Sequence, residues 1–281
     1  MKNIFVPTDF SACAAHATHA AIELAAAYRA TLHLYTALNP RTKFTKTDND
    51  QNSESEELAQ EIKNKELLLK KWEEIAKDKN AIIKTGLVQE DLLHFIESFI
   101  PENNVDFIVM GSHGASGKNE YILGSNTQKV VRLVQTPVLI IKEKLKDYKI
   151  RNVVFASNYN LSEKRSFKYL LDFVKVFKPT IHLVQINTSS WFGESYIVVK
   201  SAMDDFRKMA EDKGMTCKTH FKRDWTIDAG VRHLSKELGA DLIAISNDQR
   251  HPLKRLFIGS NVEALVNHAE TPVLAIDFPE D

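Results

Sequence analysis

The chain contains an internal repeat, the feature that most restricts how its 281 residues can fold. Residues 124–142 have the sequence GSNTQKVVRLVQTPVLIIK, and nine of these nineteen positions are identical in residues 259–277, GSNVEALVNHAETPVLAID. Upstream, VDFIVMGS at 105–112 corresponds to ADLIAISN at 240–247 with the same separation of 135 residues. The repeat predicts two copies of one fold, each near the commonest domain size of about 100–150 residues.

The repeat also indicates a domain boundary and an insertion. KNIFVPTDF at 2–10 corresponds to RNVVFASNY at 151–159, now separated by 149 residues, so the first copy has about fourteen more residues than the second. We expect the additional residues in the polar stretch 39–54. The charged segment KEKLKDYK predicts a boundary near residue 145, with a first half of residues 1–145 and a second half of residues 146–281.

Each half alternates short apolar runs with helix-like segments. In the first half, we expect strands at 4–7, 31–36, 81–88, 105–111 and 137–142, and helices at 11–29, 55–79, 91–100 and 125–134. In the second half, we expect strands at 153–157, 180–186, 216–221, 241–246 and 272–276, and helices at 161–177, 191–213, 227–238 and 261–269. Nearly continuous apolar strands separated by helices are typical of buried parallel sheets. The sequence therefore predicts the α/β class, with one parallel sheet in each of two tandem domains.

Glycines gather after the fourth expected strand of the first half. The chain has only ten glycines, yet Gly111, Gly114, Gly117 and Gly124 fall within fourteen residues, at the strand edge where open α/β sheets bind ligands. Glycine lets a backbone approach phosphate oxygens closely, and a helix that begins at Gly124-Ser125 presents free amides to an anion. The alternative is that these glycines only shape a surface loop and that Ser125 is a helix cap.

The sequence resembles a tandem universal stress protein over nearly its whole length. Nucleotide-binding members of that family carry G-2x-G-9x-G-(S/T), which Gly111, Gly114, Gly124 and Ser125 match without a gap. They also carry an aspartate after the first strand, matched by Asp9 in VPTDFS. The resemblance implies a five-stranded parallel sheet in each domain, Rossmann-like and of the adenine nucleotide alpha hydrolase kind, with ATP bound across the strand edge.

The resemblance also implies roles for single residues. Asp9 would hold the ribose or metal side of the nucleotide, while Pro7 and the backbone near Thr36 would border the adenine. ADP and AMP remain alternatives to ATP, and Mg²⁺ is an optional companion ion. The expected nucleotide-binding set consists of Pro7, Thr8, Asp9, Thr36, Gly111, Ser112, His113, Gly114, Gly124, Ser125 and Asn126.

The second half departs from this pattern. Ser246 and Gln249 stand where the first half has Gly111 and Gly114, and Asn158 stands in place of Asp9. Side chains at the glycine positions would crowd a phosphate, so we expect no ATP binding of the family's kind there. Three basic residues nearby either help to bind a different anion at the helix start or belong to a solvated loop: Arg250, Lys254 and Arg255.

Two further candidates carry weaker signals. Cys13, His16 and His19 follow one another at three-residue spacing, but a paired zinc spacing and a clear fourth ligand are missing. His113, inside the glycine-rich segment, could contact phosphate or solvent, and no positioned partner for acid–base chemistry is evident. Trp225 is expected in a core or interface.

Three functional classes remain from the sequence: a nucleotide-binding regulatory protein, a slow ATPase, and a nucleotide-independent interaction protein. Phosphate-binding features are visible, whereas a Walker A lysine and a catalytic base are not, which favours the regulatory class.

Equal numbers of basic and acidic residues, 37 each, argue against a general nucleic-acid binder. Two cysteines and no apolar run of roughly 18 residues predict a cytoplasmic protein without a membrane segment. The family resemblance implies that the two fifth strands pair, and further homodimerisation is left open.

Overall fold

The computed structural model describes residues 1–38, 51–112, 124–145, 148–188, 195–246, 260–276 and 278. Its strands are β1 (Asn3–Pro7), β2 (Thr31–Ala37), β3 (Ile82–Val88), β4 (Phe107–Gly111), β5 (Val138–Ile141), β6 (Asn152–Ala156), β7 (Thr180–Asn187), β8 (Cys217–Arg223), β9 (Leu242–Ser246) and β10 (Val273–Ile276). Its helices are α1 (Ala12–Tyr28), α2 (Gln51–Asp78), α3 (Leu92–Glu102), α4 (Ser125–Leu133), α5 (Glu163–Val174), α6 (Ser195–Glu211), α7 (Ile227–Glu237) and α8 (Ser260–His268). Among the described residues, no helix is long and apolar enough to span a membrane.

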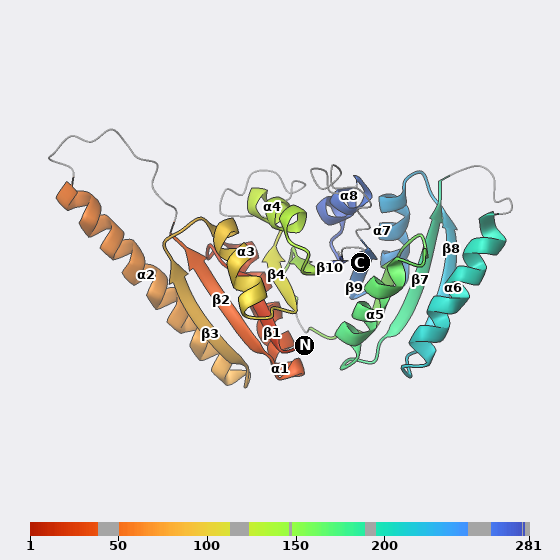
Figure 1. Ribbon diagram of the computed structural model, residues 1–281, viewed down its shortest axis with the longest axis horizontal. Coiled ribbons are helices and arrows are strands. Elements are labelled where there is room, and N and C mark those ends of the chain that lie inside the picture. The colour runs from red at the N-terminus through yellow and green to blue at the C-terminus, as the bar shows by residue number, and fades with distance from the viewer. Residues whose placement is uncertain are drawn as a thin grey trace.

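The two halves form one continuous sheet of ten strands. Its order is β3-β2-β1-β4-β5-β10-β9-β6-β7-β8, so each half contributes five strands in the same internal order (Figure 1). Pairing is parallel within each half, whereas β5 and β10 pair antiparallel at the centre, with Leu139 opposite Leu274. The predicted pairing of the fifth strands is therefore present. It leaves β3 and β8 as the outer edges of the sheet.

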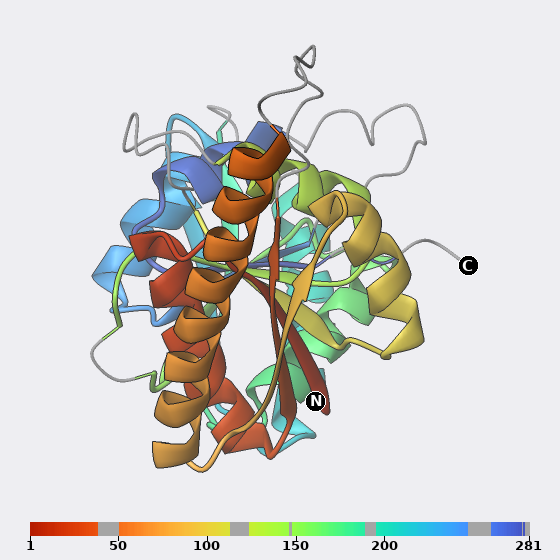
Figure 2. The same cartoon turned by 90° about the vertical axis from the view of Figure 1, so that its left-hand side faces the viewer.

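Successive residues of a strand pack alternately into two hydrophobic cores, one on each face of the sheet. In β1, Ile4 and Val6 belong to the core beneath α1, α2, α5 and α6, while Phe5 belongs to the core beneath α3, α4, α7 and α8. Within each half, Figures 1 and 2 show the helices of these two groups on opposite faces of the sheet. A sheet that is covered on both faces explains why its strands are apolar at successive positions.

Helix boundaries follow from local capping. Ser11 precedes α1 and accepts a hydrogen bond from the Ala14 amide at 3.2 Å, and Arg29 ends the helix in the left-handed conformation with φ of 56°. Asp91 and Thr226 cap α3 and α7 in the same manner as Ser11 caps α1. Such caps satisfy amides that have no partner within their own helix.

The extra length of the first half lies largely in a helix. α2 has 28 residues, whereas its counterpart α6 has 17. The sequence placed the insertion in the polar stretch 39–54, and part of that stretch, from Gln51 onward, belongs to α2. The helix therefore begins at Gln51, four residues before the predicted start at residue 55.

Side-chain contacts also join the halves beneath the central strands. The Tyr28 hydroxyl of α1 donates to the Phe173 carbonyl of α5, and the Tyr169 hydroxyl of α5 donates to the Asp106 carbonyl at 2.9 Å. The Phe107 and Phe173 rings meet edge to face with centroids 5.0 Å apart. The two halves thus share a core on this face as well as a strand pairing.

Candidate functional site

The turn between β1 and α1 is held by hydrogen bonds of its own. The Thr8 amide donates to the Tyr35 carbonyl of β2 at 2.8 Å, and the buried Thr8 hydroxyl accepts from the Phe10 amide at 3.0 Å. Asp9 is exposed, and its Oδ1 accepts from the Ser11 amide at 2.9 Å. The turn therefore fixes the backbone on both sides of Asp9 and presents its carboxylate at the carboxyl edge of the sheet.

Gly111, the last residue of β4, lies against the first turn of α1. A β-carbon at this position would be 2.6 Å from the Cys13 carbonyl carbon and 2.9 Å from the Ala14 nitrogen, so no larger residue fits. On its other side, the Gly111 carbonyl accepts from the Thr127 hydroxyl of α4 at 2.8 Å. Gly111 thus joins the beginnings of two helices. Its lack of a side chain allows this helix packing, and the predicted close approach to a phosphate remains a prediction.

The start of α4 is held beside the end of β4. The Ser112 amide donates to the Ile141 carbonyl of β5 at 3.1 Å, and the Ser112 carbonyl accepts from the Gly124 amide at 2.6 Å. Gly124 is the N-cap of α4 and provides no side-chain cap, while Ser125 and Asn126 are exposed in the first turn. An exposed helix start without a side-chain cap favours an anion, because its amides and dipole are positive there.

A buried polar group lies at the neighbouring strand end. The Thr36 hydroxyl of β2 is buried and has no hydrogen-bond partner among the described residues. Because β1 pairs with both β2 and β4, the ends of these three strands meet at one edge of the sheet. A nucleotide base, which carries both donors and acceptors, has the chemistry to satisfy such a hydroxyl.

The structure therefore gathers most of the predicted residues at one edge, with Pro7, Thr8 and Asp9 beside Thr36 on one side and Gly111 and Ser112 on the other. Gly124, Ser125 and Asn126 complete this edge from α4. His113 and Gly114 lie outside the described residues. Thr127 was not predicted, and the only signal for it was its place in the first turn of the helix that follows Gly124-Ser125.

The corresponding edge of the second half is built differently. Asn158 replaces Asp9, and a carboxylate is supplied from within by Glu163, which is only 4% exposed. Glu163 Oε2 accepts from the Ser157 hydroxyl at 2.6 Å and from the Asn160 amide at 3.0 Å. Asn160 stands where the first half has Ser11, whose amide bonds to Asp9. The second half thus has a buried carboxylate in the first turn of α5 that bonds to the β6–α5 turn, where the first half has the exposed Asp9.

In the second half, Ser246 replaces the glycine at the end of the fourth strand. It occupies the position of Gly111, and its hydroxyl donates to the Ser166 hydroxyl of α5 at 3.2 Å. α5 begins at Glu163, two residues later than the repeat would place the equivalent of Ala12. The later start of the helix leaves room for a side chain at the strand end, and no glycine is required.

The histidine and cysteine run on α1 lies beside the end of β5. Cys13 Sγ and His16 Nδ1 both approach the Lys142 carbonyl, at 3.9 and 3.3 Å, while His19 packs edge to face on Trp72. His19 thus contacts α2, whereas the other two contact the end of β5. Within the described part of the chain, no three His, Cys, Asp or Glu side chains gather closely enough to hold a metal ion.

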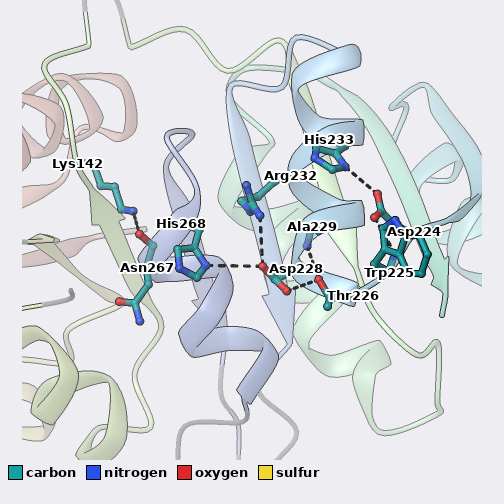
Figure 3. A network of polar contacts seen from close by, with 10 residues as sticks. All are labelled: Lys142, Asp224, Trp225, Thr226, Asp228, Ala229, Arg232, His233, Asn267 and His268. Carbon is teal, nitrogen blue, oxygen red and sulfur yellow. Dashed lines mark hydrogen bonds and ion pairs between the residues drawn. The ribbon is translucent and has the colours of Figure 1, made fainter. Parts of the chain in front are cut away.

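Lys142 extends from the same point into the second half. Its ammonium donates to the Asn267 carbonyl near the end of α8 at 2.5 Å, and burial lowers the pKa of Lys142 to about 8. Figure 3 shows this contact beside a second one, in which His268 Nδ1 lies 3.7 Å and Arg232 Nη2 lies 3.5 Å from Asp228 Oδ2. A cation at a helix C-terminus is favourable. These contacts connect the first-half edge to α8 and α7.

Two stretches of the chain, residues 1–142 and 149–277, match the model of the universal stress protein family. The chain belongs to the universal stress protein family. Two copies of the family domain follow one another, which accounts for the repeat. Among curated relatives, universal stress protein MJ0577 of Methanocaldococcus jannaschii is 35% identical over 95 residues, or 34% of this chain and 56% of the relative. YxiE of Bacillus subtilis is 35% identical over 88 residues, or 31% of this chain and 60% of the relative. The chain thus spans little more than half the length of these two relatives.

Solved structures of the family share the tandem fold. A universal stress protein from Archaeoglobus fulgidus matches with a TM-score of 0.69 at 18% identity, covering 98% of each chain. One universal stress protein structure is a complex with cAMP, but its TM-score of 0.38 and identity of 15% are too low to transfer a site to this chain.

Proposed function

We propose that the first half binds an adenine nucleotide, ATP foremost, and that occupancy of this site regulates the second half. The observation that carries the proposal is the position of Gly111, where the first turns of α1 and α4 meet at the end of β4. This arrangement sets the uncapped start of α4 beside the turn that carries Asp9. An anion-binding helix start and a carboxylate that can accept from hydroxyl groups are what a ribose phosphate needs.

Each part of the nucleotide has a group of matching chemistry at this edge. The start of α4 would take the phosphates, and Asp9 would accept from ribose hydroxyls or contact Mg²⁺ bound with the phosphates. The buried Thr36 hydroxyl, which has no partner among the described residues, would pair with the base. Thr8, Ser112 and Thr127 would hold these groups in place through the backbone.

A regulatory role is favoured over catalysis for two reasons. The sequence has no Walker A lysine motif, and phosphoryl transfer needs charge stabilisers and an oriented nucleophile in addition to phosphate binding. The same edge is connected to the second half, because Cys13 and His16 contact the Lys142 carbonyl and the Lys142 ammonium contacts α8. A nucleotide that shifts the start of α1 would change these contacts.

The test is an isothermal titration of the full chain with ATP, with and without Mg²⁺. We expect saturable binding that is weakened about tenfold or more in Asp9→Ala, since a hydrogen bond to a charged group contributes about 1.5–3 kcal/mol. Asn158→Ala, the same change at the equivalent position of the second half, should leave the affinity unchanged. Equal affinities in wild type and Asp9→Ala, or no binding at all, would contradict the proposal and favour a nucleotide-independent interaction protein.

Phosphate release in the same samples separates regulation from hydrolysis. We expect ATP to remain intact over hours of incubation with stoichiometric protein. Release that follows enzyme concentration and disappears in Asp9→Ala would assign a slow ATPase to this site instead.

A further inference from the structure

The outer edge of the first-half sheet is formed by β3, which pairs with a described strand on one side only. Figure 2 faces this edge, where β3 runs between α2 and α3. The Val88 carbonyl accepts from the Leu38 amide, just beyond β2, at 2.8 Å. Because backbone groups alternate in direction along a strand, those of Ile83, Thr85 and Leu87 point away from β2. These groups can pair with another strand, and no described segment of the chain does so.

A second copy of β3 fits this edge. When two β3 strands are placed antiparallel with Thr85 at the centre, Thr85 lies opposite Thr85 and Ile83 lies opposite Leu87. The outward backbone groups of the two strands then meet one another. Lys84, the one charged residue of the strand, lies opposite Gly86. The register therefore brings no like charges together, and it places β-branched and apolar residues across from one another, which is favourable.

Lys84 also gains a partner in this register. The Tyr35 ring of β2 covers Gly86 of the same copy, since a β-carbon at Gly86 would be only 2.3 Å from Tyr35 Cε1. Residues that lie opposite each other in an antiparallel pair point to the same face of the sheet. The exposed Lys84 of one copy would therefore lie beside the Tyr35 ring of the other, and an ammonium group over an aromatic face is stabilising.

The other outer edge of the sheet, β8, does not have this self-complementarity. Pairing β8 with a second β8 antiparallel over its full length would place Lys218 opposite Lys222 and His220 opposite itself. Both lysines and the following Arg223 are exposed. Charged side chains of this kind keep edge strands from pairing. The two edges of the sheet thus differ, and self-pairing is favoured at β3.

α2 carries a stripe of alternating charge along the β3 edge. Glu66, Lys70, Glu73 and Lys77 are exposed and follow one another at spacings of four, three and four residues. Residues at these spacings share one side of a helix. The Thr85 hydroxyl donates to Glu73 Oε1 at 2.6 Å, which places this side of α2 toward β3.

Two copies of this stripe match each other when they run antiparallel. Glu66 of one helix then faces Lys77 of the other, and Lys70 faces Glu73. Helical side chains lean toward the N-terminus, so the Glu73 carboxylate on Thr85 lies near the centre of the stripe, and one twofold axis serves both strand and helix. No ion pair joins Glu66, Lys70 or Lys77 to another described residue, so these charges are available to a partner.

We propose that two copies of the chain associate through this surface, with β3 against β3 and α2 against α2, about a twofold axis at Thr85. Within the chain, β5 and β10 already pair antiparallel at the centre of the sheet. The proposed contact repeats that arrangement at the outer edge and joins two ten-stranded sheets. A small and largely polar interface is typical of weak association, so the dimer forms only at high protein concentration. The proposal does not depend on nucleotide binding, because the surface contains none of the residues expected to contact the nucleotide.

Sedimentation equilibrium of the full chain, from micromolar to near-millimolar concentration, measures the association. We expect a monomer at low concentration and a dimer, with no larger species, at high concentration. Glu66→Lys would face Lys77 of the other copy at two places related by the axis. It should weaken the dimer about tenfold, since two modest attractions become repulsions. Lys77→Glu should weaken it equally.

Mixing these two variants separates a lost contact from a damaged fold. A dimer of one Glu66→Lys chain with one Lys77→Glu chain has opposite charges at both places, so the equimolar mixture should recover most of the association. Lys71→Glu makes the same kind of charge change at an exposed position on the other side of α2 and should have no effect.

Thr85→Pro tests the strand pairing separately from the helix charges. Proline removes the outward amide at the centre of the interface, and an edge strand tolerates it where the amide faces away from the sheet. The dimer should be lost in this variant. The proposal is wrong if wild type stays monomeric near millimolar concentration, if either charge variant associates like wild type, or if their mixture associates no better than each alone. A dimer that persists in Thr85→Pro would also overturn it.

Discussion

Gly111 lies so close to Cys13 that a β-carbon at residue 111 would be 2.7 Å from the Cys13 carbonyl oxygen. Real β-carbons essentially never come this near to backbone, and the backbone of α1 cannot move aside as a flexible side chain can. The contact fixes the start of α1 relative to the end of β4. The phosphate-binding geometry proposed for the first half depends on that placement.

Gly111→Ala should destabilise the protein by about 1–3 kcal/mol, because the added methyl group overlaps the first turn of α1. Urea denaturation followed by circular dichroism measures the change. The matched variant Ser246→Ala removes one partly buried hydrogen bond to Ser166 and should cost about 0.5–1.5 kcal/mol. A Gly111→Ala protein as stable as wild type would contradict the packing described here.

The class of fold and the succession of strands and helices along each half could be predicted from the sequence, because buried parallel strands are apolar throughout and the repeat gives every element twice. The packing of Gly111 against α1 could not be predicted, since a glycine required by a neighbouring helix looks the same in sequence as one required by a ligand. Trp225 was expected in a core or interface, yet it is 94% exposed, because the turn before α7 directs it to solvent.

Stability should fall as the pH drops from about 6.5 to about 4, in part because of His182. Its Nε2 contacts Asn152 Oδ1 at 3.3 Å, and its Nδ1 contacts His220 Nε2 at 2.9 Å. Burial, followed by the charges of His220 and Lys218, lowers the pKa of His182 to about 4. The unfolded chain binds this proton near pH 6.5 and the folded chain only near pH 4, so each pH unit between them removes up to about 1.4 kcal/mol.

Urea midpoints measured at pH 7, 6, 5 and 4 test the contribution of His182. His182→Gln should show a shallower decline over this range than wild type, whatever its stability at pH 7. His94→Gln, which changes an exposed histidine on α3, should keep the wild-type slope. Parallel slopes in wild type and His182→Gln would show that His182 does not carry this pH dependence.

Two tyrosines should respond oppositely to loss of the hydroxyl. Tyr28→Phe removes the bond to the Phe173 carbonyl that joins the halves and should destabilise the protein by about 0.5–1.5 kcal/mol. Tyr148→Phe removes a buried hydroxyl without a partner and should be neutral or slightly stabilising. Differential scanning calorimetry of both variants measures the difference. A larger loss in Tyr148→Phe than in Tyr28→Phe would contradict these assignments.

The first half expressed alone, residues 1–145, should not remain a monomer. β5 would lose β10, and a strand edge with unpaired backbone groups promotes association. Light scattering after size-exclusion chromatography should show a dimer, formed by β5 of one copy pairing with β5 of another. A well-behaved monomer at tens of micromolar would mean that the second half is not needed to cover this edge.

The gathering of candidate residues at one edge was predictable where a residue type has a chemical reason to stand at a strand end or helix start, as with Asp9 and with Gly124-Ser125. The contacts that hold these residues in place were not predictable, because their hydrogen-bond partners lie further along the sequence. The Ser112 carbonyl bonds to the Gly124 amide, and Thr127 bonds to Gly111, through contacts that only the folded chain reveals. The same holds for Glu163, whose buried position replaces an exposed aspartate.

The number of ATP molecules bound per chain tests the central claim most directly. Equilibrium dialysis of the full chain against labelled ATP at saturating concentration should give one, because the first half keeps an exposed carboxylate beside an uncapped helix start and the second half does not. The same measurement on Asp9→Ala, at a concentration that just saturates wild type, should fall well below one. Two molecules per chain, none, or one that is retained in Asp9→Ala would contradict the account.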